Sequence, residues 1–113
     1  MKLKTDKDRE KILKIELERI VKIIIKDYKP EKIILFGSLV HGEIHKWSDI
    51  DLLVIKKTNK RPIERCIDIA KLIHPKLGID IFVYTPEEYE ILLKERFTLL
   101  LEIQKKGKII YEI

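Results

Sequence analysis

Apolar residues recur over the first 28 positions with a period close to 3.6, which predicts one long amphipathic helix. Thr5, followed by Asp8, resembles a capping box at the start of this helix. Pro30 ends it soon after Tyr28. The positions that set the period, and that we expect on its buried face, are Ile12, Ile15, Ile20, Ile23 and Ile24.

Three short apolar runs predict buried β-strands at residues 33–36, 49–55 and 79–84. Gly37 ends the first strand, and residues 39–43 form a short helix or a turn before the second. A helix is predicted from Pro62 to His74, because proline suits the first helical position and the second proline at 75 ends the segment. Its expected buried face comprises Ile63, Ile67, Ala70 and Ile73.

The C-terminal segment opens with a strong helix start, in which Thr85 is the N-cap, Pro86 the first helical residue and Glu88 the capping-box partner. We expect this helix to continue to Lys106, with a small edge strand at residues 109–111. The order of elements predicts an α/β fold of the α+β kind, a mixed sheet of about four strands flanked by helices. Its 113 residues suit one domain, spanning residues 1–113.

Composition adds a basic balance, with a net charge of +5 and a pI near 9.2. This balance indicates either an anionic partner or simply a solvated Lys/Glu surface. The single cysteine excludes an internal disulfide bond, and the charged N-terminal residues do not resemble a signal peptide. No uncharged run approaches the roughly 18 residues of a membrane span. We therefore expect a cytoplasmic protein without a membrane partner.

Two aspartates, Asp49 and Asp51, lie one residue apart at the start of the second predicted strand. Alternate residues of a strand project to the same side, so the two carboxylates lie close and repel each other. A hard divalent cation such as Mg²⁺ would offset this repulsion. The alternative is a pair of solvated aspartates at a strand end, where repulsion in water costs little.

Two further features bear on this choice. Gly37-Ser38 follows the first strand, and a glycine there lets a phosphate approach the backbone, although a plain turn is the alternative. Asp80 is the only charged residue within the predicted strand at 79–84. If that strand neighbours the second one, Asp80 reaches the same face. Three carboxylates beside a phosphate site indicate metal-dependent phosphoryl or nucleotidyl transfer.

The combined pattern, Gly37-Ser38, ten residues, then Asp49-Ile50-Asp51 and a later strand with Asp80, resembles the polymerase-β-type nucleotidyltransferase superfamily. The segments SDIDLLV and IDIFVYTPEE are similar in particular to the minimal nucleotidyltransferase (MNT) family. Many of these proteins are antitoxins of HEPN-class toxins. The resemblance covers roughly residues 10 to 112.

This resemblance implies a site and a reaction. Asp49, Asp51 and Asp80 would be catalytic and would bind two Mg²⁺ ions, while Gly37 and Ser38 would bind the triphosphate of ATP. Asp80 would also act as, or position, the base for an acceptor hydroxyl. AMP would pass to a hydroxyl, in characterised pairs a tyrosine, of a HEPN-type toxin partner in a type VII-like toxin–antitoxin pair.

The chain departs from the family at Leu39-Val40-His41-Gly42, where many relatives have a small residue and an arginine before the glycine. Replacing a guanidinium by an imidazole weakens the expected phosphate contacts. Two alternatives to the protein adenylyltransferase stay open. One is an antitoxin that acts only by binding, and the other is a nucleotidyltransferase for small molecules or RNA, whose relatives carry additional acceptor-binding domains.

Other candidates have less support from the sequence. His41 and His45 are four residues apart, a spacing that can bind Zn²⁺ on a helix. Trp47 could stack on adenine, pack internally or contact a partner. The basic residues Lys56, Lys57, Lys60 and Arg61 could touch nucleic acid, but no base-reading motif accompanies them and direct nucleic-acid binding is not expected. The Ile-rich first helix predicts a homo- or hetero-oligomer.

Overall fold

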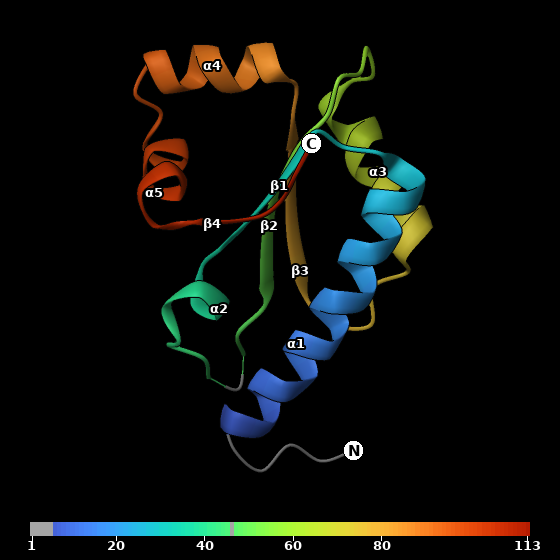
Figure 1. Cartoon of the computed structure of the whole chain (residues 1–113), viewed down its shortest axis with the longest axis vertical. Helices are drawn as coiled ribbons and strands as arrows, with labels where there is room; N and C mark the ends of the chain where they lie inside the picture. The colour runs from blue at the N-terminus through green and yellow to red at the C-terminus, as the bar shows by residue number, and fades with distance from the viewer. Residues whose placement is uncertain (1–5, 46) are drawn as a thin grey trace.

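A four-stranded mixed sheet forms the centre of the protein, as the sequence predicts (Figure 1). The computed structural model describes residues 6–45 and 47–113; the expected cap Thr5 lies outside them. The strand order is β3-β2-β1-β4, with β2 parallel to β3 and β1 antiparallel to both β2 and β4. The strands are β1 (Lys32–Phe36), β2 (Ile50–Ile55), β3 (Ile79–Tyr84) and β4 (Lys108–Glu112).

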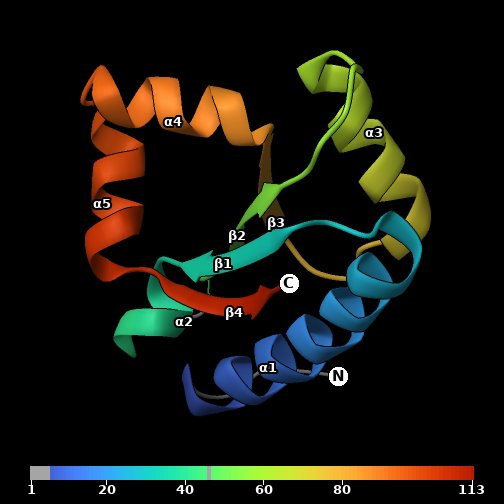
Figure 2. The same cartoon turned by 45° about the horizontal axis from the view of Figure 1, so that its top comes forward.

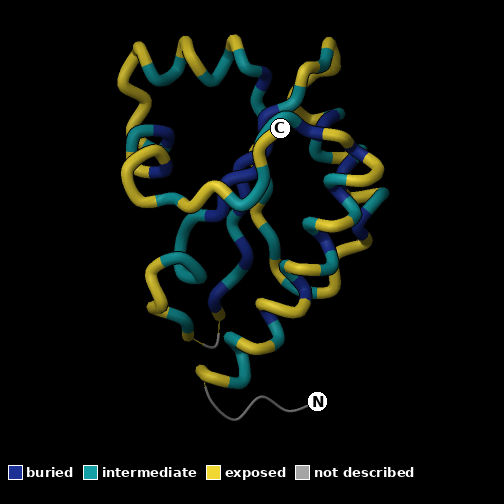
Figure 3. Tube along the Cα trace, in the orientation of Figure 1, coloured by how far each residue is buried: buried dark blue, intermediate teal, exposed yellow. Residues whose placement is uncertain are grey.

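One face of the sheet is covered by the N-terminal helix and by the helix that connects β2 to β3 (Figure 2). The first of these is α1 (Asp6–Ile23), which continues into the π-helical turn η1 (Ile24–Tyr28); the second is α3 (Pro62–Ile73). Nearly every residue of β2 is buried, so the centre of the sheet anchors the core (Figure 3). The main core cluster includes Leu13, Ile20, Ile24, Ile33, Ile50, Leu52, Val54, Ile69 and Ile73.

The other face is covered by two C-terminal helices, α4 (Pro86–Lys94) and α5 (Thr98–Lys106). Leu100 and Ile103 of α5 pack there against Ile34, Leu53 and Ile55 of the sheet. Asp80 and Phe82 of β3 also point to this face but stay exposed, so its cover is partial. The short helix α2 (Ser38–His41) follows β1 directly. Among the described helices, none is long and apolar enough to cross a bilayer.

The expected single helix from Pro86 to Lys106 is wrong, because the chain breaks it into α4 and α5. Arg96 adopts a left-handed conformation with φ of 58°. The Phe97 N–H then donates to the Leu92 carbonyl at 2.9 Å and the Arg96 N–H to the Leu93 carbonyl at 3.0 Å, the bonds of a Schellman motif. The turn redirects the chain so that Leu100 and Ile103 reach the sheet.

The predicted buried faces of the helices are also partly wrong. Ile63, Ile67 and Ala70 of α3 are exposed, and its buried residues are Arg65, Ile69 and Ile73. On α1, Ile15 is 70% exposed, while Glu16 beside it is buried. Both helices carry isoleucines on more than one side, so periodicity alone does not select the face that meets the sheet.

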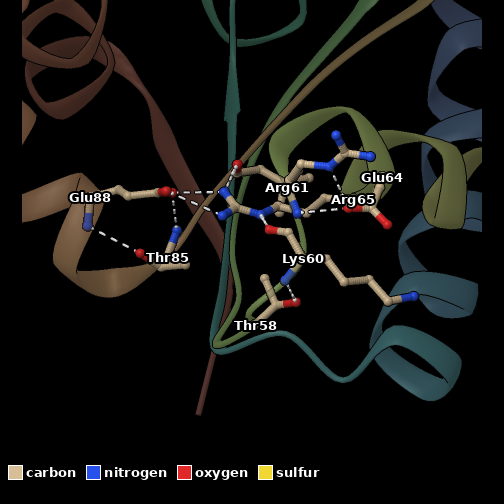
Figure 4. A network of polar contacts seen from close by, with 8 residues as sticks. Thr58, Lys60, Arg61, Glu64, Arg65, Thr85 and Glu88 are labelled. Carbon is tan, nitrogen blue, oxygen red and sulfur yellow. Dashed lines mark hydrogen bonds and ion pairs between the residues drawn. The ribbon is translucent and has the colours of Figure 1, made fainter.

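A buried arginine, Arg65 of α3, joins three elements on the β3 side of the sheet (Figure 4). Its guanidinium donates to the carbonyls of Lys60 and Val83, at 2.8 and 3.1 Å, and to both carboxylate oxygens of Glu88, at 2.7 and 3.1 Å. The Glu88 carboxylate also accepts a bond from the Thr85 N–H at the start of α4. This network fixes the start of α4 beside β3.

We predict that Glu88→Gln destabilises the protein by about 1–2 kcal/mol at neutral pH, because the buried guanidinium loses its charged partner. Glu64→Gln is the matched control. Glu64 is the third residue of α3, as Glu88 is of α4, and it accepts a hydrogen bond from the backbone N–H of its N-cap residue, Arg61. It also pairs with the Arg61 side chain, which is 80% exposed, whereas the Arg65 side chain is 5% exposed. Urea unfolding of both variants measures the difference.

The effect of Glu88→Gln depends on pH in a defined direction. The hydrogen bond to Arg65 lowers the pKa of Glu88 below its ordinary 4.5. The ionised carboxylate therefore adds stability above pH 4.5, and this stability is lost as pH falls through the lowered folded-state pKa. A loss that is equal for Glu88→Gln and Glu64→Gln, or that does not shrink in acid, contradicts the prediction.

Candidate active site

β1 ends at the same end of the sheet where β2 and β3 begin (Figure 1). Asp49, Asp51 and Asp80 all belong to this end, since Asp49 precedes β2 and the other two are near the starts of β2 and β3. The parallel register places Asp51 of β2 directly opposite Asp80 of β3. Their side chains are within hydrogen-bonding reach of each other. The strand that carries Asp80 is thus the neighbour of the strand that carries Asp51. This is the arrangement that the two carboxylates need if they are to lie on the same face of the sheet.

Asp49 lies just before β2, beside the residue that precedes β3. The Ile50 N–H donates to the Gly78 carbonyl at 3.1 Å, which brings the two segments together. A Cβ atom at Gly78 would collide with Oδ1 of Asp49. The missing side chain at Gly78 therefore makes the space that the Asp49 carboxylate occupies.

Gly37 plays the same part for Asp51. It follows Phe36, the β1 residue opposite Asp51, and a Cβ there would collide with Asp51 Oδ2. Its φ of 78° and ψ of −151° are also a conformation that almost only glycine adopts. The Asp49 carboxylate is thus packed against Gly78, and the Asp51 carboxylate against Gly37.

The pKa of Asp51 is raised from 3.8 to about 6. Burial is the largest cause, followed by the negative charge of Asp80, the hydrogen bond to Asp80 and the charge of Asp49. Because the folded-state pKa lies above the unfolded one, the ionised carboxylate opposes folding above about pH 6. This cost is relieved as pH falls through 6 toward 3.8, or when a cation binds.

The donor set fits a hard divalent cation, since carboxylate oxygens are the ligands that Mg²⁺ prefers. In the side-chain positions of the described residues, however, no three His, Cys, Asp or Glu groups converge to hold a metal ion. Asp51 and Asp80 face each other, whereas Asp49 turns Oδ1 toward Arg9 of α1, with 3.7 Å between Oδ1 and Nη2. The site thus has the chemistry of a metal site, with Asp49 held by a cationic side chain.

A small cavity of about 70 Å³ lies beside Gly37, between β1, α2 and α5. His41 and Lys106 both line it, and both also line an adjoining open hollow with Glu43. Lys106, from the C-terminal part of the chain, thus places a cation near His41, and it pairs with Glu102 of the same cavity lining at 3.4 Å. Ser38, the first residue of α2, follows Gly37 directly.

The remaining sequence candidates are resolved differently. His41 ends α2 and His45 lies beyond Gly42, so the two histidines do not share a helix and the zinc hypothesis loses its geometric basis. Trp47 is 80% exposed, which leaves a stacking or partner contact open and excludes a packing role.

The basic residues after β2 are engaged within the protein. Lys56 donates to the Tyr28 carbonyl, and Lys57 pairs with Glu31 at 3.6 Å. Lys60 pairs with Asp68 at 2.6 Å, and Arg61 with Glu64 at 3.0 Å. Each of these four cations thus has a partner within the protein.

Sequence reasoning missed three residues of this region: Arg9, Gly78 and Lys106. Gly78 could have been identified from its position two residues before Asp80. Arg9 and Lys106 had none, because each is one of 24 Lys and Arg residues in the chain and reaches the site only through tertiary packing.

The geometry defines a protein of the nucleotidyltransferase class. A family model described as polymerase beta, nucleotidyltransferase, matches residues 18–113, and the chain belongs to this family. A search of curated protein sequences gave no significant match.

Solved structures share the fold. One is described as a nucleotidyltransferase from Sulfolobus solfataricus, with a TM-score of 0.67, 19% identity and coverage of 98% of this chain and 90% of that one. A toxin–antitoxin structure with AMP-PNP has a TM-score of 0.56 and 24% identity, covering 85% and 73%. A mutant of the toxin–antitoxin pair MntA-HpeT has a TM-score of 0.53 and 24% identity, covering 86% and 72%. At these identities the likeness shows that the chain shares their fold.

We predict that Gly37→Ala costs more stability than Gly42→Ala and that it abolishes the Mg²⁺-dependent ATP binding that the family resemblance implies for this site. Both glycines have φ near 75°, but a Cβ at Gly42 meets nothing within 4 Å, whereas one at Gly37 displaces Asp51. Gly42→Ala therefore costs only about 1–2 kcal/mol of backbone strain. Calorimetric ATP titration and urea unfolding compare the two. Equal ATP affinity in both variants would contradict the role given to Gly37.

Proposed function

We propose that this protein is a Mg²⁺-dependent nucleotidyltransferase that transfers AMP from ATP to a hydroxyl group of a partner protein. The observation that carries the proposal is the in-register pairing of Asp51 with Asp80, with Asp49 and Gly37 packed beside them. Membership of the polymerase beta nucleotidyltransferase family supports the reaction class. We take residues 1–113 as one catalytic domain.

Each residue has a proposed part in the reaction. Asp49, Asp51 and Asp80 would hold two Mg²⁺ ions, and metal bound there would stabilise the charge that develops on the transferring phosphoryl group and on the leaving pyrophosphate. Gly37 and Ser38 bind the phosphates through backbone N–H groups and the hydroxyl. Asp80 is exposed on β3, where an acceptor can approach, and it takes the proton of the acceptor hydroxyl.

The bonds balance as follows. The acceptor oxygen forms a bond to the α-phosphorus of ATP, and the bond from that phosphorus to the bridging oxygen breaks. Pyrophosphate leaves with that oxygen and its electron pair. The acceptor's proton passes to the Asp80 carboxylate and from there to water. No oxidant or further reactant is required.

The proposed acceptor is a tyrosine of a HEPN-type toxin, and the protein is the antitoxin of that pair in the cytoplasm. Two of the similar structures are toxin–antitoxin proteins, one of them with AMP-PNP, which supports a toxin partner and a nucleotide substrate. Exposed apolar side chains such as Trp47 and Ile15 support association with a partner or a second copy.

A second function, neutralisation by binding alone, is favoured by one observation. Among the described residues the three carboxylates do not converge on a common point. In that case the toxin would be silenced without any covalent change. A small-molecule or RNA acceptor is the third possibility, and no feature of the described residues favours it.

The two main functions separate in one experiment. Mixed with its partner toxin, ATP and Mg²⁺, the wild-type protein is expected to add one AMP to the toxin. Asp80→Asn is expected to keep most of its ATP affinity and to lose at least 100-fold in transfer rate, because the acceptor proton has no base. Intact-mass spectrometry of the toxin measures the transfer. Neutralisation without a mass change, equal for wild type and Asp80→Asn, would show a binding antitoxin.

Lys106 is proposed to contact the ATP phosphates in place of the arginine that many relatives have. Lys106→Met is expected to weaken ATP binding in the presence of Mg²⁺ by about tenfold, the loss of one charge-assisted contact. Lys105→Met is the matched control, because Lys105 is the preceding residue of α5 and does not line the cavity beside Gly37. Titrations with and without EDTA establish that the binding requires metal. An equal affinity of the two variants would remove Lys106 from the site.

A further inference from the structure

Arg9 is the unassigned residue in closest contact with the aspartate site. It lies in the first half of α1, 39 residues before Ser48 in the sequence. Its side chain is only 11% exposed, whereas Lys and Arg side chains usually extend into solvent. A nearly buried guanidinium is expected to have specific partners.

Those partners lie in the segment that leads into β2. Arg9 Nε and Nη2 both donate to the backbone carbonyl of Ser48, at 3.1 and 2.8 Å, and Nη2 lies 3.7 Å from Asp49 Oδ1. Ser48 is itself buried and tied to His45, whose N–H donates to its hydroxyl at 2.9 Å and whose carbonyl accepts from its N–H at 2.9 Å. Arg9 thus holds the backbone of the residue before Asp49 through two hydrogen bonds.

The position of Asp49 requires such an anchor. Three like charges share one end of the sheet, and Asp49 lies one residue before β2, next to the Ile50 N–H that donates to the Gly78 carbonyl. Its repulsion from Asp51 and Asp80 would turn the carboxylate outward. Gly78 provides space on one side of Oδ1, and Arg9 provides attraction on another.

We infer that Arg9 is a positioning residue that holds Asp49 in place for metal binding; this rests on the proposed function. Arg9 acts through Asp49 and does not itself bind the metal or the nucleotide. The two hydrogen bonds to the Ser48 carbonyl fix the backbone from which the Asp49 side chain projects. The longer contact, 3.7 Å from Nη2, attracts Oδ1 of the Asp49 carboxylate.

This role and a merely electrostatic one predict opposite signs. If Arg9 only neutralised the carboxylates, its removal would leave a more negative site and a cation would bind more tightly. If Arg9 positions Asp49, its removal weakens cation binding despite the loss of a competing positive charge. Residues that orient metal ligands in this way typically contribute 10- to 100-fold to metal affinity.

The test measures Mn²⁺ binding to the nucleotide-free protein, from the electron paramagnetic resonance signal of free Mn²⁺. Arg9→Met is expected to weaken Mn²⁺ binding by about tenfold or more. Arg9→Lys keeps the charge but loses the two-pronged contact, and is expected to weaken it as well. Both variants are compared at equal folded fraction, established by circular dichroism.

Arg19→Met is the matched control. Arg19 lies on the same helix and its guanidinium also donates to backbone carbonyls, those of Ile73 and His74, at 2.8 and 3.2 Å. It pairs with Glu16, away from the aspartate site. Its replacement is expected to lower stability and to leave Mn²⁺ affinity unchanged, which separates positioning of Asp49 from general support of α1.

The outcomes distinguish the inference from the proposed function. Wild-type protein that binds Mn²⁺ only weakly, or equally well after Asp51→Asn, overturns the proposed metal site and the inference with it. Wild-type binding that depends on Asp51, but that Arg9→Met leaves unchanged or strengthens, overturns the inference alone. An equal loss in Arg9→Met and Arg19→Met also overturns it, because the effect would then belong to the helix.

Discussion

The parallel pairing of β2 with β3 is the constraint on which the site depends. In-register pairing places Asp51 and Asp80 opposite each other, and the strands cannot separate these like charges without losing their hydrogen bonds. The pairing is held by the apolar residues that follow the aspartates, since Ile50, Leu52, Leu53 and Val54 are fully buried. The core thus supplies the free energy that keeps two carboxylates together.

The two faces of the sheet divide stability from chemistry. The face under α1 and α3 carries most of the buried apolar side chains, and it joins the N-terminal helix to the crossover between β2 and β3. The other face is covered by α4 and α5 only in part, with Asp80 and Phe82 exposed beside the covered region. A sheet closed on both faces would have no place for a nucleotide or an acceptor.

The parts of this architecture that local sequence determines were predictable. The bounds of β3 and α3, the proline-marked helix starts and the aspartates of neighbouring strands all follow from apolar runs, turn residues and alternation along a strand. The break between α4 and α5 was not, because it depends on Arg96 in a left-handed conformation, with no glycine or proline to mark it. The buried face of α3 was not predictable either, since isoleucines occur on its exposed side and an arginine, Arg65, occupies the buried side.

The candidate site shows the same limit in another form. The sequence motif identifies the groups proposed to carry the chemistry, Gly37, Ser38 and the three aspartates, because their spacing within strands and turns is local. It does not define the groups that surround them. Arg9 and Lys106 come from the two ends of the chain, and only the packing of α1 and α5 against opposite faces of the sheet brings them to the same end of it.

The charge of the site links its stability to its ligands. The raised pKa of Asp51 means that at neutral pH the folded protein keeps a carboxylate ionised in surroundings that disfavour its charge. The guanidinium of Arg9, 3.7 Å from Asp49 Oδ1, offsets part of the mutual repulsion of the aspartates. A bound cation would offset the remainder, so metal binding and folding stabilise each other. Repulsion between the carboxylates, which adds to the effect of burial on Asp51, is the part of this cost that a divalent ion would relieve directly. A site with fewer carboxylates would therefore be more stable and would bind metal less well.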